Sequence, residues 1–365
     1  MIKASYDGEH NTAIIEFEGN IDAAQAEQFF VDIEKVLPKH GKGFKLLADF
    51  SSVDTMELEV QRAIKKAMEF FNAQGVTEIL RVIPDPALEI GFNAMSTSRY
   101  SREVKVHTLR SRQEAQAHLR KEEQNANSNK LEVKDAVIFV TGANRGIGKA
   151  LVEIALEQGA KKIYAAARKP ETLKQMVEKN PGRVIPIELD VTSEQQVQEA
   201  AKQAPDVTLL VNNAGSASLG GFTANYDAEG ARNDMKTNYF GTLSMAIAFA
   251  PVLKKNGGGA IVNIVSVAGL QSFPFGAGYS ASKAAAHSLT QGLRQELVEQ
   301  KTFVAGVYPG PVDTDMARGV EMEKESPRQV ALNVYKGLEE GSEEIYPDKY
   351  AVEFSLSLKA KAAVA

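Results

Sequence analysis

Two spacings of apolar residues alternate along the chain from residue 133 onward. Short apolar runs are typical of strands buried in a parallel sheet, and the segments between them carry apolar residues at helical spacing. Strands are predicted at Ala136–Val140, Lys162–Ala167, Arg183–Leu189, Thr208–Val211, Ala260–Val265 and Phe303–Tyr308, with a short one at Glu344–Tyr346. Helices are predicted at 147–158, 172–179, 193–203, 230–253, 278–299 and 327–339. Repeated strand–helix units of this kind predict an α/β fold with a doubly wound parallel sheet of about seven strands.

The first 120 residues have the pattern of a smaller α/β domain. Gly19 and Asn20 are interpreted as a turn after the first strand, and Ser51 and Ser52 as turn residues after the second. The predicted elements are strands at Ala13–Glu18, Phe44–Phe50, Ile79–Ile83 and Val104–Leu109, and helices at 23–37, Glu57–Ala73 and Gln113–Arg120.

A polar segment separates the two patterns. Residues 121–130 read KEEQNANSNK and contain a single apolar residue, Ala126. Such a composition is typical of a surface linker. We therefore expect an accessory domain at 1–120, a linker at 121–132 and a second domain at 133–365.

Composition narrows the classes of function. The net charge of −5 argues against a nucleic-acid partner, because phosphate binding needs a basic surface. The chain has no cysteine, and its five histidines show no HxH or HxxxH spacing, so no metal site is expected. The N-terminus has no apolar signal core, and apolar runs are shorter than the ~20 residues that span a bilayer. We expect a cytoplasmic protein without a membrane partner.

The first strand of the second domain leads into a glycine-rich turn and a helix. Gly142, Gly146 and Gly148 have the spacing GxxxGxG. Glycines allow a tight turn and a close backbone approach, and the helix N-terminus offers free N–H groups to a pyrophosphate. A turn that merely needs glycine is the alternative, but the flanking strand and helix favour a dinucleotide site.

The end of the second strand of this domain bears on the choice of nucleotide. NAD enzymes carry a carboxylate there for the ribose hydroxyls, whereas this chain has Ala167, Arg168 and Lys169. Arg168 can bind a 2′-phosphate, and Arg145 in the glycine loop can assist. If both are solvated surface charges the argument fails; we favour NADP(H) over NAD(H).

Tyr279 and Lys283 are four residues apart in a predicted helix, so their side chains project from the same face. A lysine ammonium and a positively charged nicotinamide would lower the tyrosine pKa toward neutrality, which suits an acid/base. Ser266, at the end of a strand, can bind a substrate oxygen. Asn238, within a long predicted helix, is a further catalytic candidate.

These motifs together resemble the short-chain dehydrogenase/reductase family over residues 133–350. They are TGANRGIG at 141–148, LDV at 189–191, NNAG at 212–215, MKTN at 235–238, NIVS at 263–266, YSASK at 279–283 and YPGPVDT at 308–314. The family usually has two serines before its catalytic site, and here the first is Val265. The resemblance implies a Rossmann-like fold, a small-molecule carbonyl or alcohol substrate, and a homo-oligomer packed through the helices that hold Asn238 and Tyr279.

The resemblance also implies roles for single residues. Tyr279 corresponds to the general acid/base, Lys283 to the residue that lowers its pKa and holds the nicotinamide ribose, and Ser266 to the residue that orients the carbonyl. Asn238 corresponds to the residue that links Lys283 to solvent through a water. With the glycine loop and Arg168, the expected cofactor contacts are Gly142, Asn144, Arg145, Gly146, Ile147, Gly148, Arg168, Asp190, Val191, Asn212, Ala214, Gly215, Tyr279, Lys283, Pro309, Gly310 and Thr314.

The sequence says less about the substrate. The loop after Thr314 is short, which suggests a small or medium aldehyde or ketone. Phe273, Pro274, Phe275 and Met316 are apolar candidates for the mouth of the pocket, and plain packing is an equal alternative for each.

Residues 1–120 resemble STAS-like domains, which include anti-sigma-factor antagonists. The resemblance rests on the GNID segment and on LLADFSSV before a helix. Those proteins carry a phosphorylatable serine at the helix start, whereas this chain has Thr55, Met56 and Glu57, which argues against such a switch. The resemblance implies a regulatory or interaction module with a protein partner. Two alternatives to a reductase with such a module remain: a non-catalytic NADP(H)-sensing signalling or scaffold protein, and a first domain that forms a lid over the active site.

Overall fold

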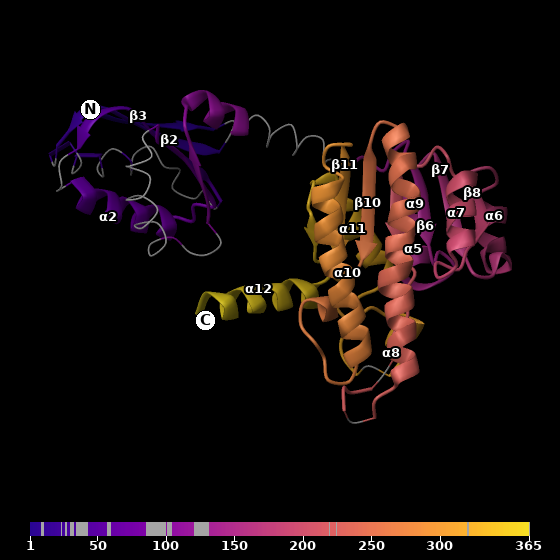
Figure 1. Ribbon diagram of the computed structural model, residues 1–365. Helices are drawn as coiled ribbons and strands as arrows, with labels where there is room; N and C mark the ends of the chain where they lie inside the picture. Colours follow the sequence, from indigo (N-terminus) through magenta and orange to yellow (C-terminus); the bar gives the residue numbers. More distant parts are fainter. Residues whose placement is uncertain are drawn as a thin grey trace. The chain divides into compact units, whose positions relative to one another are not determined.

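The computed structural model describes residues 1–8, 11–22, 24, 25, 28, 29, 33, 43–56, 60–84, 100, 104–119, 131–218, 220–223, 225–319 and 321–364. The chain forms two compact units, Met1–Asn125 and Ala126–Val364. We call them unit 1 and unit 2 and describe each by itself (Figure 1). Among the described residues no helix is both long and apolar enough to cross a bilayer.

Unit 1 has a five-stranded sheet with the strand order β1-β2-β3-β4-β5. β1 is antiparallel to β2, and the other neighbours are parallel. Helix α2 (Val60–Ala73) covers one face, and helix 112–119 covers the other with Ala115 and Leu119. The strands are β1 (Ile2–Asp7), β2 (Thr12–Ile21), β3 (Lys45–Met56), β4 (Glu78–Val82) and β5 (Lys105–Leu109).

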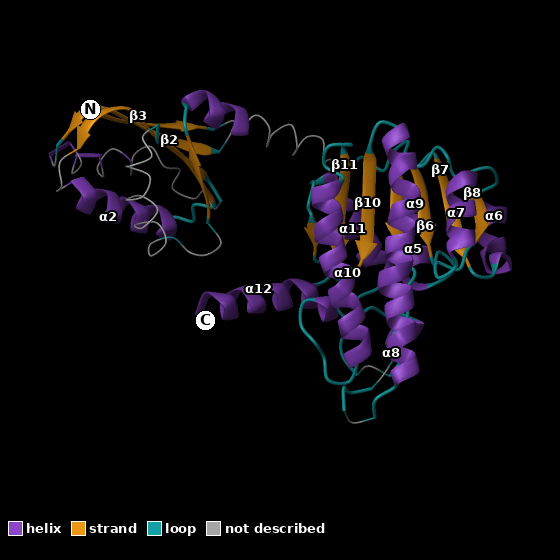
Figure 2. Ribbon diagram, in the orientation of Figure 1, coloured by secondary structure: helices purple, strands orange, loops and turns teal. Residues whose placement is uncertain are grey.

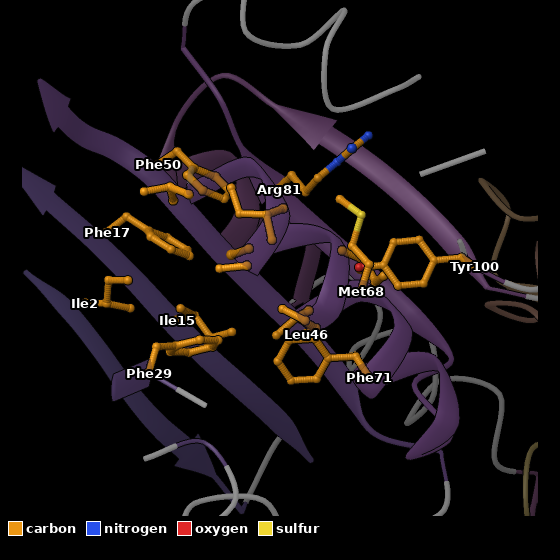
Figure 3. A pocket seen from close by; sticks show the side chains of 16 residues that line it. Ile2, Ile15, Phe17, Phe29, Leu46, Phe50, Met68, Phe71, Arg81 and Tyr100 are labelled. Carbon is orange, nitrogen blue, oxygen red and sulfur yellow. The ribbon is translucent and has the colours of Figure 1, made fainter. Parts of the chain in front are cut away.

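The face of the sheet beneath α2 is apolar. Figure 3 shows Phe17 and Phe50 on the sheet side and Met68 and Phe71 on the helix side of a small cavity of ≈ 50 Å³. The rings of Phe17 and Phe50 stack at 4.3 Å between centroids. This cluster is the hydrophobic core of unit 1, because its alternating strand residues and one helix face are removed from water together.

Two turns expected in unit 1 are wrong. Gly19 and Asn20 lie inside β2, where the register against β3 shifts and Gly19 takes a φ of +71°, so the glycine serves a bulge. Ser51 and Ser52 lie inside β3, which runs on to Met56. The N–H of Ser51 is held by the Asp49 carboxylate at 2.9 Å.

One strand of unit 1 was not predicted, and several predicted segments of unit 1 cannot be compared with the structure. The strand β1 was not predicted, although Ile2, Ala4 and Tyr6 alternate with polar residues and pack against the core; none of its residues is fully buried. Most of the predicted helix 23–37, the first residues of the predicted helix Glu57–Ala73, and the predicted linker residues 121–130 lie outside the described residues.

Unit 2 has a seven-stranded sheet with the order β12-β11-β10-β9-β6-β7-β8, and every neighbouring pair is parallel. The strands are β6 (Val137–Thr141), β7 (Lys162–Ala167), β8 (Val184–Glu188), β9 (Leu209–Asn212), β10 (Gly259–Ile264), β11 (Thr302–Val307) and β12 (Glu344–Ile345). The helices are α5 (Gly146–Glu157), α6 (Lys174–Lys179), α7 (Glu194–Gln203), α8 (Ala228–Asp234), α9 (Thr242–Lys255), α10 (Ala277–Glu296), α11 (Pro327–Glu339) and α12 (Lys349–Val364).

Helices cover both faces of this sheet (Figure 2). One buried apolar cluster joins the strands to α5, α6 and α11, and a second joins them to α7, α9 and α10. The strand order reverses between β9 and β6, which is the switch point where ligands of open α/β sheets bind. The predicted doubly wound, Rossmann-like parallel sheet of seven strands is confirmed.

The predicted helix 230–253 is continuous but not uniform. Between α8 and α9, residues Met235–Gly241 form a π-helical turn that contains Asn238. Single π-helical turns concentrate at functional sites because the extra residue redirects a side chain. The last helix, α12, was not predicted, and it extends away from both helical layers of unit 2 (Figure 1).

Candidate active site

A cavity of ≈ 1220 Å³ opens at the carboxyl end of the parallel strands of unit 2. Loops after six strands contribute to its wall, as expected for the ligand-binding edge of an open α/β sheet. Of the predicted cofactor contacts, those that line it are Gly142, Asn144, Arg145, Gly146, Ile147, Arg168, Asp190, Val191, Ala214, Gly215, Tyr279, Lys283, Pro309, Gly310 and Thr314.

Two predicted contacts lie behind this wall. Asn212 is buried, and its side-chain amide donates to the Asn263 side chain at 2.9 Å. Gly148 is also behind the wall, where a Cβ atom would lie 2.2 Å from the Gly142 carbonyl oxygen. Gly148 therefore acts by letting α5 approach the glycine loop, and the structure gives no side-chain contact between Asn212 and the cavity.

Asn213 joins the glycine loop to the loop after β9. Its side-chain amide donates to the carbonyl oxygens of Thr141 at 2.9 Å and Gly142 at 3.2 Å. The Thr141 hydroxyl in turn accepts the N–H groups of Asn213 and Ala214, each at 2.9 Å. Sequence reasoning missed Asn213, although it stands in the middle of the NNAG motif.

The glycine loop itself needs glycine at two positions that face the cavity. Gly142 and Gly146 have φ values of +65° and +53°, a region that other residues rarely adopt. Within the described part of the chain, Arg145 precedes α5 without a side-chain hydrogen bond to its first turn. The first N–H groups of α5 can therefore meet an anion in the cavity.

Basic side chains gather at the end of the cavity near β7 and β8. Arg168 and Lys169 are exposed and line it, and so does Lys236, which sequence reasoning missed. Arg145 also lines the cavity, but its guanidinium pairs with the Asp315 carboxylate at 3.0 Å. This end of the cavity can hold an anionic group.

The carboxylate of Asp190 lies beside these cations. Burial alone would raise the pKa of Asp190, but the hydroxyl and N–H of Thr192, with the charges of Arg168 and Lys236, lower it below its ordinary value. The two Thr192 groups donate at 2.7 and 2.9 Å. Asp190 is therefore ionised and held in place.

The predicted catalytic side chains meet on one wall. Tyr279 and Lys283 are one turn apart on α10, with the Lys283 ammonium nitrogen (Nζ) 5.8 Å from the centre of the Tyr279 ring. Ser266 follows β10 and hydrogen-bonds Tyr279, and its hydroxyl also accepts the N–H of Ala268 at 3.1 Å. Lys283 donates to the carbonyl oxygen of Ile264 at 2.8 Å.

Burial shifts the pKa values of both titratable groups, Tyr279 and Lys283, in the protein on its own. Burial raises the pKa of Tyr279, the hydrogen bond with Ser266 opposes this, and the charge of Asp234 adds to it. Burial lowers the pKa of Lys283 to about 8, against the opposing charge of Asp234. In the protein on its own, burial outweighs any stabilisation of the phenolate; the expected lowering depends on a positively charged nicotinamide as well and stays a prediction.

Asn238 supports this wall from behind. Its side chain accepts the N–H of Ser216 at 2.9 Å and donates to the Ser216 carbonyl at 2.9 Å and to the Ser282 hydroxyl at 2.8 Å. A Cβ atom at position 215 would lie 3.0 Å from Asn238 Oδ1 and 3.6 Å from Lys283 Nζ. Gly215 therefore lets Asn238 and Lys283 approach the same point.

Asp234 is a further buried group that sequence reasoning missed. Its carboxylate accepts the Ser216 hydroxyl at 2.7 Å and the Ser218 N–H at 2.9 Å. It stands four residues before Asn238 on the same helix face, a spacing that could have identified it.

Apolar side chains also line the cavity. Phe273, Phe275 and Met316 line the cavity as expected, together with Met322 and Tyr350; Pro274 is not part of the lining described. Phe275 and Met316 are 61% and 49% exposed, so they are accessible to a ligand.

Comparison with known proteins points in the same direction as this geometry. The sequence profile of the short chain dehydrogenase family matches residues 136–325. An uncharacterised oxidoreductase of Staphylococcus epidermidis is 34% identical over 195 residues, which are 52% of this chain and 83% of that protein.

Two solved structures are similar to unit 2. A short chain dehydrogenase from Burkholderia cenocepacia in complex with NADP is 43% identical, with a TM-score of 0.60, and the match covers 63% of this chain and 95% of that one. A short chain dehydrogenase/reductase from Burkholderia phymatum in complex with NAD is 27% identical, with a TM-score of 0.58 and the same coverage.

Proposed function

The chain belongs to the short-chain dehydrogenase family of oxidoreductases, and we propose that it interconverts a carbonyl and an alcohol with NADP(H). The observation that carries this proposal is the convergence of Ser266, Tyr279 and Lys283 on the wall of a cavity that the glycine loop also lines. When a hydride is transferred to a carbonyl carbon, the carbonyl oxygen needs a hydrogen-bond donor and a proton. These three side chains can supply both.

The glycine loop fits a dinucleotide. Gly142 and Gly146 have backbone angles that favour glycine, and a Cβ at Gly148 would collide with the Gly142 carbonyl, so these positions keep a cradle open beside the N-terminus of α5. When bound, the nicotinamide cofactor supplies or accepts the hydride. Lys283 and Thr314 are proposed to hold its nicotinamide end.

The protein's own contribution is to move a proton and hold the oxygen. In the direction of reduction, the Tyr279 hydroxyl gives its proton to the substrate oxygen as the carbonyl carbon gains a hydride, and the Ser266 hydroxyl donates a hydrogen bond to that oxygen. The Lys283 ammonium stabilises the phenolate that Tyr279 becomes. Asn238 and Ser216 are proposed to hold the water that connects Lys283 to solvent.

The choice of NADP(H) rests on charge. Arg168, Lys169 and Lys236 line one end of the cavity, and a 2′-phosphate adds negative charge that these cations can bind. The similar Burkholderia cenocepacia protein is in complex with NADP, and the Burkholderia phymatum protein with NAD. We propose NADP(H) as the preferred cofactor and NAD(H) as the weaker one.

The substrate is proposed to be a small or medium aldehyde or ketone with an apolar side. Phe273, Phe275, Met316 and Tyr350 give the cavity an apolar wall beside the catalytic groups. Their burial by an apolar substituent would favour binding at roughly 25 cal/mol per Å².

Unit 1 is proposed to be a regulatory or interaction module of STAS-like fold without a catalytic role, in a chain divided into 1–120, a linker at 121–132 and 133–365. A mostly parallel sheet with α2 on one face is the feature of unit 1 that supports this proposal. We further propose that the reductase self-associates through the helices that hold Asn238 and Tyr279. Phe240 and Ile247 are more than half exposed there and would be buried by a second copy.

The test is binding of NADPH and NADH to the purified chain, followed by oxidation of NADPH in the presence of a panel of aldehydes and ketones. Turnover of a carbonyl with tighter NADPH than NADH binding is expected. Tight binding with no turnover across the panel would replace this proposal with an NADP(H) sensor, and absence of binding would overturn both.

A further inference from the structure

Three side chains with metal-binding atoms meet in unit 1, away from its apolar core. Glu78 begins β4, His107 lies in β5, and His118 lies in helix 112–119. Glu78 is paired with Lys105 in the parallel ladder, so His107, two residues further on, faces the same side of the sheet. Helix 112–119 covers that side and brings His118 to the same point.

The distances between these atoms suit a shared ion. The Nε2 atoms of His107 and His118 lie 3.0 and 3.2 Å from the same carboxylate oxygen, Glu78 Oε1, and the three atoms all lie within 4.8 Å of one another. Ligands at 2.0–2.1 Å around a tetrahedral zinc ion are roughly 3.3 Å apart. Small side-chain adjustments would therefore place one ion among these atoms.

The orientation of His107 is the second observation. Its Nε2 is shielded from solvent and makes no hydrogen bond within the described part of the chain, although Glu78 Oε1 is only 3.0 Å away. A buried ring nitrogen normally has a partner. Ligands of one ion approach each other closely while their lone pairs point at the ion between them, which is a geometry of this kind.

Lys45 is the group that opposes a cation here. Its ammonium lies 3.4 Å from the other carboxylate oxygen, Glu78 Oε2. That contact leaves Oε1 facing the two histidines. A group that hydrogen-bonds the second oxygen of a metal-ligating carboxylate orients it in the same way. The positive charge of Lys45, however, weakens the binding of a cation. The histidine side chains are 37% and 28% exposed, which gives an ion a route to the otherwise buried Glu78.

We propose that Glu78, His107 and His118 form a binding site for one divalent transition-metal ion, of which Zn²⁺ is the best match, with water as the fourth ligand. Two imidazole nitrogens and one carboxylate oxygen are a donor set that Zn²⁺ binds. The ion fastens helix 112–119 to β4 and β5. The sequence conceals this site because the ligands come from three separate elements at no metal-binding spacing.

The direct experiment is a calorimetric titration of Zn²⁺ into the tag-free full chain after treatment with a chelator. Because the chain has no cysteine and only five histidines, background binding is low. One ion per chain is expected, and His107→Gln and His118→Gln should each weaken its affinity by more than about 10-fold. His287→Gln, which removes a histidine from α10 in unit 2, is the matched control and should leave the affinity unchanged.

Lys45→Met provides a test in the opposite direction, which a misfolded protein could not mimic. Removal of the ammonium beside Glu78 should strengthen Zn²⁺ binding, and Zn²⁺ should raise the melting temperature of this variant and of the unaltered chain. Two outcomes overturn the proposal. One is the absence of saturable binding at micromolar Zn²⁺, and the other is binding of equal strength in the His107→Gln/His118→Gln double variant.

Discussion

Gly310, in the loop after β11, donates its backbone N–H to the buried carboxylate of Asp348 at 2.8 Å. The same carboxylate accepts the N–H of Ala351 at 2.8 Å in the first turn of α12. A side chain at position 310 would collide with Asp348 and Tyr350, so only glycine allows this approach. One aspartate therefore joins α12 to the loop proposed to hold the nicotinamide end of the cofactor.

Replacement of Asp348 by alanine should disturb that loop. The change leaves two N–H groups without their charged acceptor, which should lower the free energy of unfolding by about 1–3 kcal/mol and weaken NADPH binding. Denaturant unfolding and NADPH titration measure the two effects. Glu353→Ala, on the exposed side of α12, is the control and should stay within about 0.5 kcal/mol. Unchanged NADPH affinity in Asp348→Ala would show that the loop after β11 does not contribute to cofactor binding through Asp348.

Gly148→Ala should damage the nucleotide site although Gly148 does not itself line the cavity. The new Cβ would lie 2.2 Å from the Gly142 carbonyl oxygen and 2.4 Å from Asn213 Nδ2, so α5 must move away from the glycine loop. We expect NADPH affinity to fall at least about 10-fold. Gly292→Ala in α10 is the matched control, because its Cβ meets nothing within 4 Å and alanine favours a helix by roughly 0.5–1 kcal/mol. Equal behaviour of the two variants would contradict the close approach of α5.

Arg168→Gln should change the preference between the two cofactors. Loss of the guanidinium removes a charge-assisted contact to the 2′-phosphate, worth about 1.5–3 kcal/mol, so NADPH should weaken by roughly 10- to 100-fold while NADH changes little. Arg145→Gln should have a smaller effect, since Arg145 is already paired with Asp315. The measurement is the dissociation constant of each cofactor for each variant. If the ratio of the NADPH and NADH dissociation constants is the same in Arg168→Gln as in the unaltered chain, Arg168 does not bind the 2′-phosphate.

Lys283 carries a measurable dependence of stability on pH. Burial lowers its pKa from 10.5 to about 8, while the charge of Asp234 opposes the shift. Between these values the unfolded chain binds the proton that the folded chain has lost, so this group adds stability as pH rises from about 8 to 10.5. Below pH 8 its buried charge is a constant penalty. Lys283→Met should therefore melt several degrees higher at pH 7, with the difference narrowing above pH 8; a gap that is independent of pH would refute the shift.

The periodicity of apolar residues was sufficient to predict the strands of unit 2, because buried parallel strands are near-continuous apolar runs. The strand β7 was predicted with the bounds that the structure has, and β6 and β9 within one residue at each end. The glycine loop and the order of motifs likewise placed the cavity, since the chain order of the strands dictates which loops meet at the switch point.

The features of the site that could not be predicted depend on contacts between residues that are distant in the sequence. The bonds of Asn213 arise only when the loops after β6 and β9 meet, and the bonds of Asp234 only when α8 packs against the loop after β9. The burial that raises the pKa of Tyr279 in the protein on its own was not predicted, because desolvation is a property of the packed wall. The bulge at Gly19 looked like a turn, since both need a positive φ.

The replacement of Tyr279 by phenylalanine tests the central claim most directly, because it removes one hydroxyl and keeps the ring on α10. Steady-state oxidation of NADPH with a carbonyl substrate of the unaltered chain should fall by about 100-fold or more, while the NADPH dissociation constant stays within a few-fold. That result assigns the proton transfer to Tyr279. Turnover retained at near its original rate, with cofactor binding intact, would contradict the account.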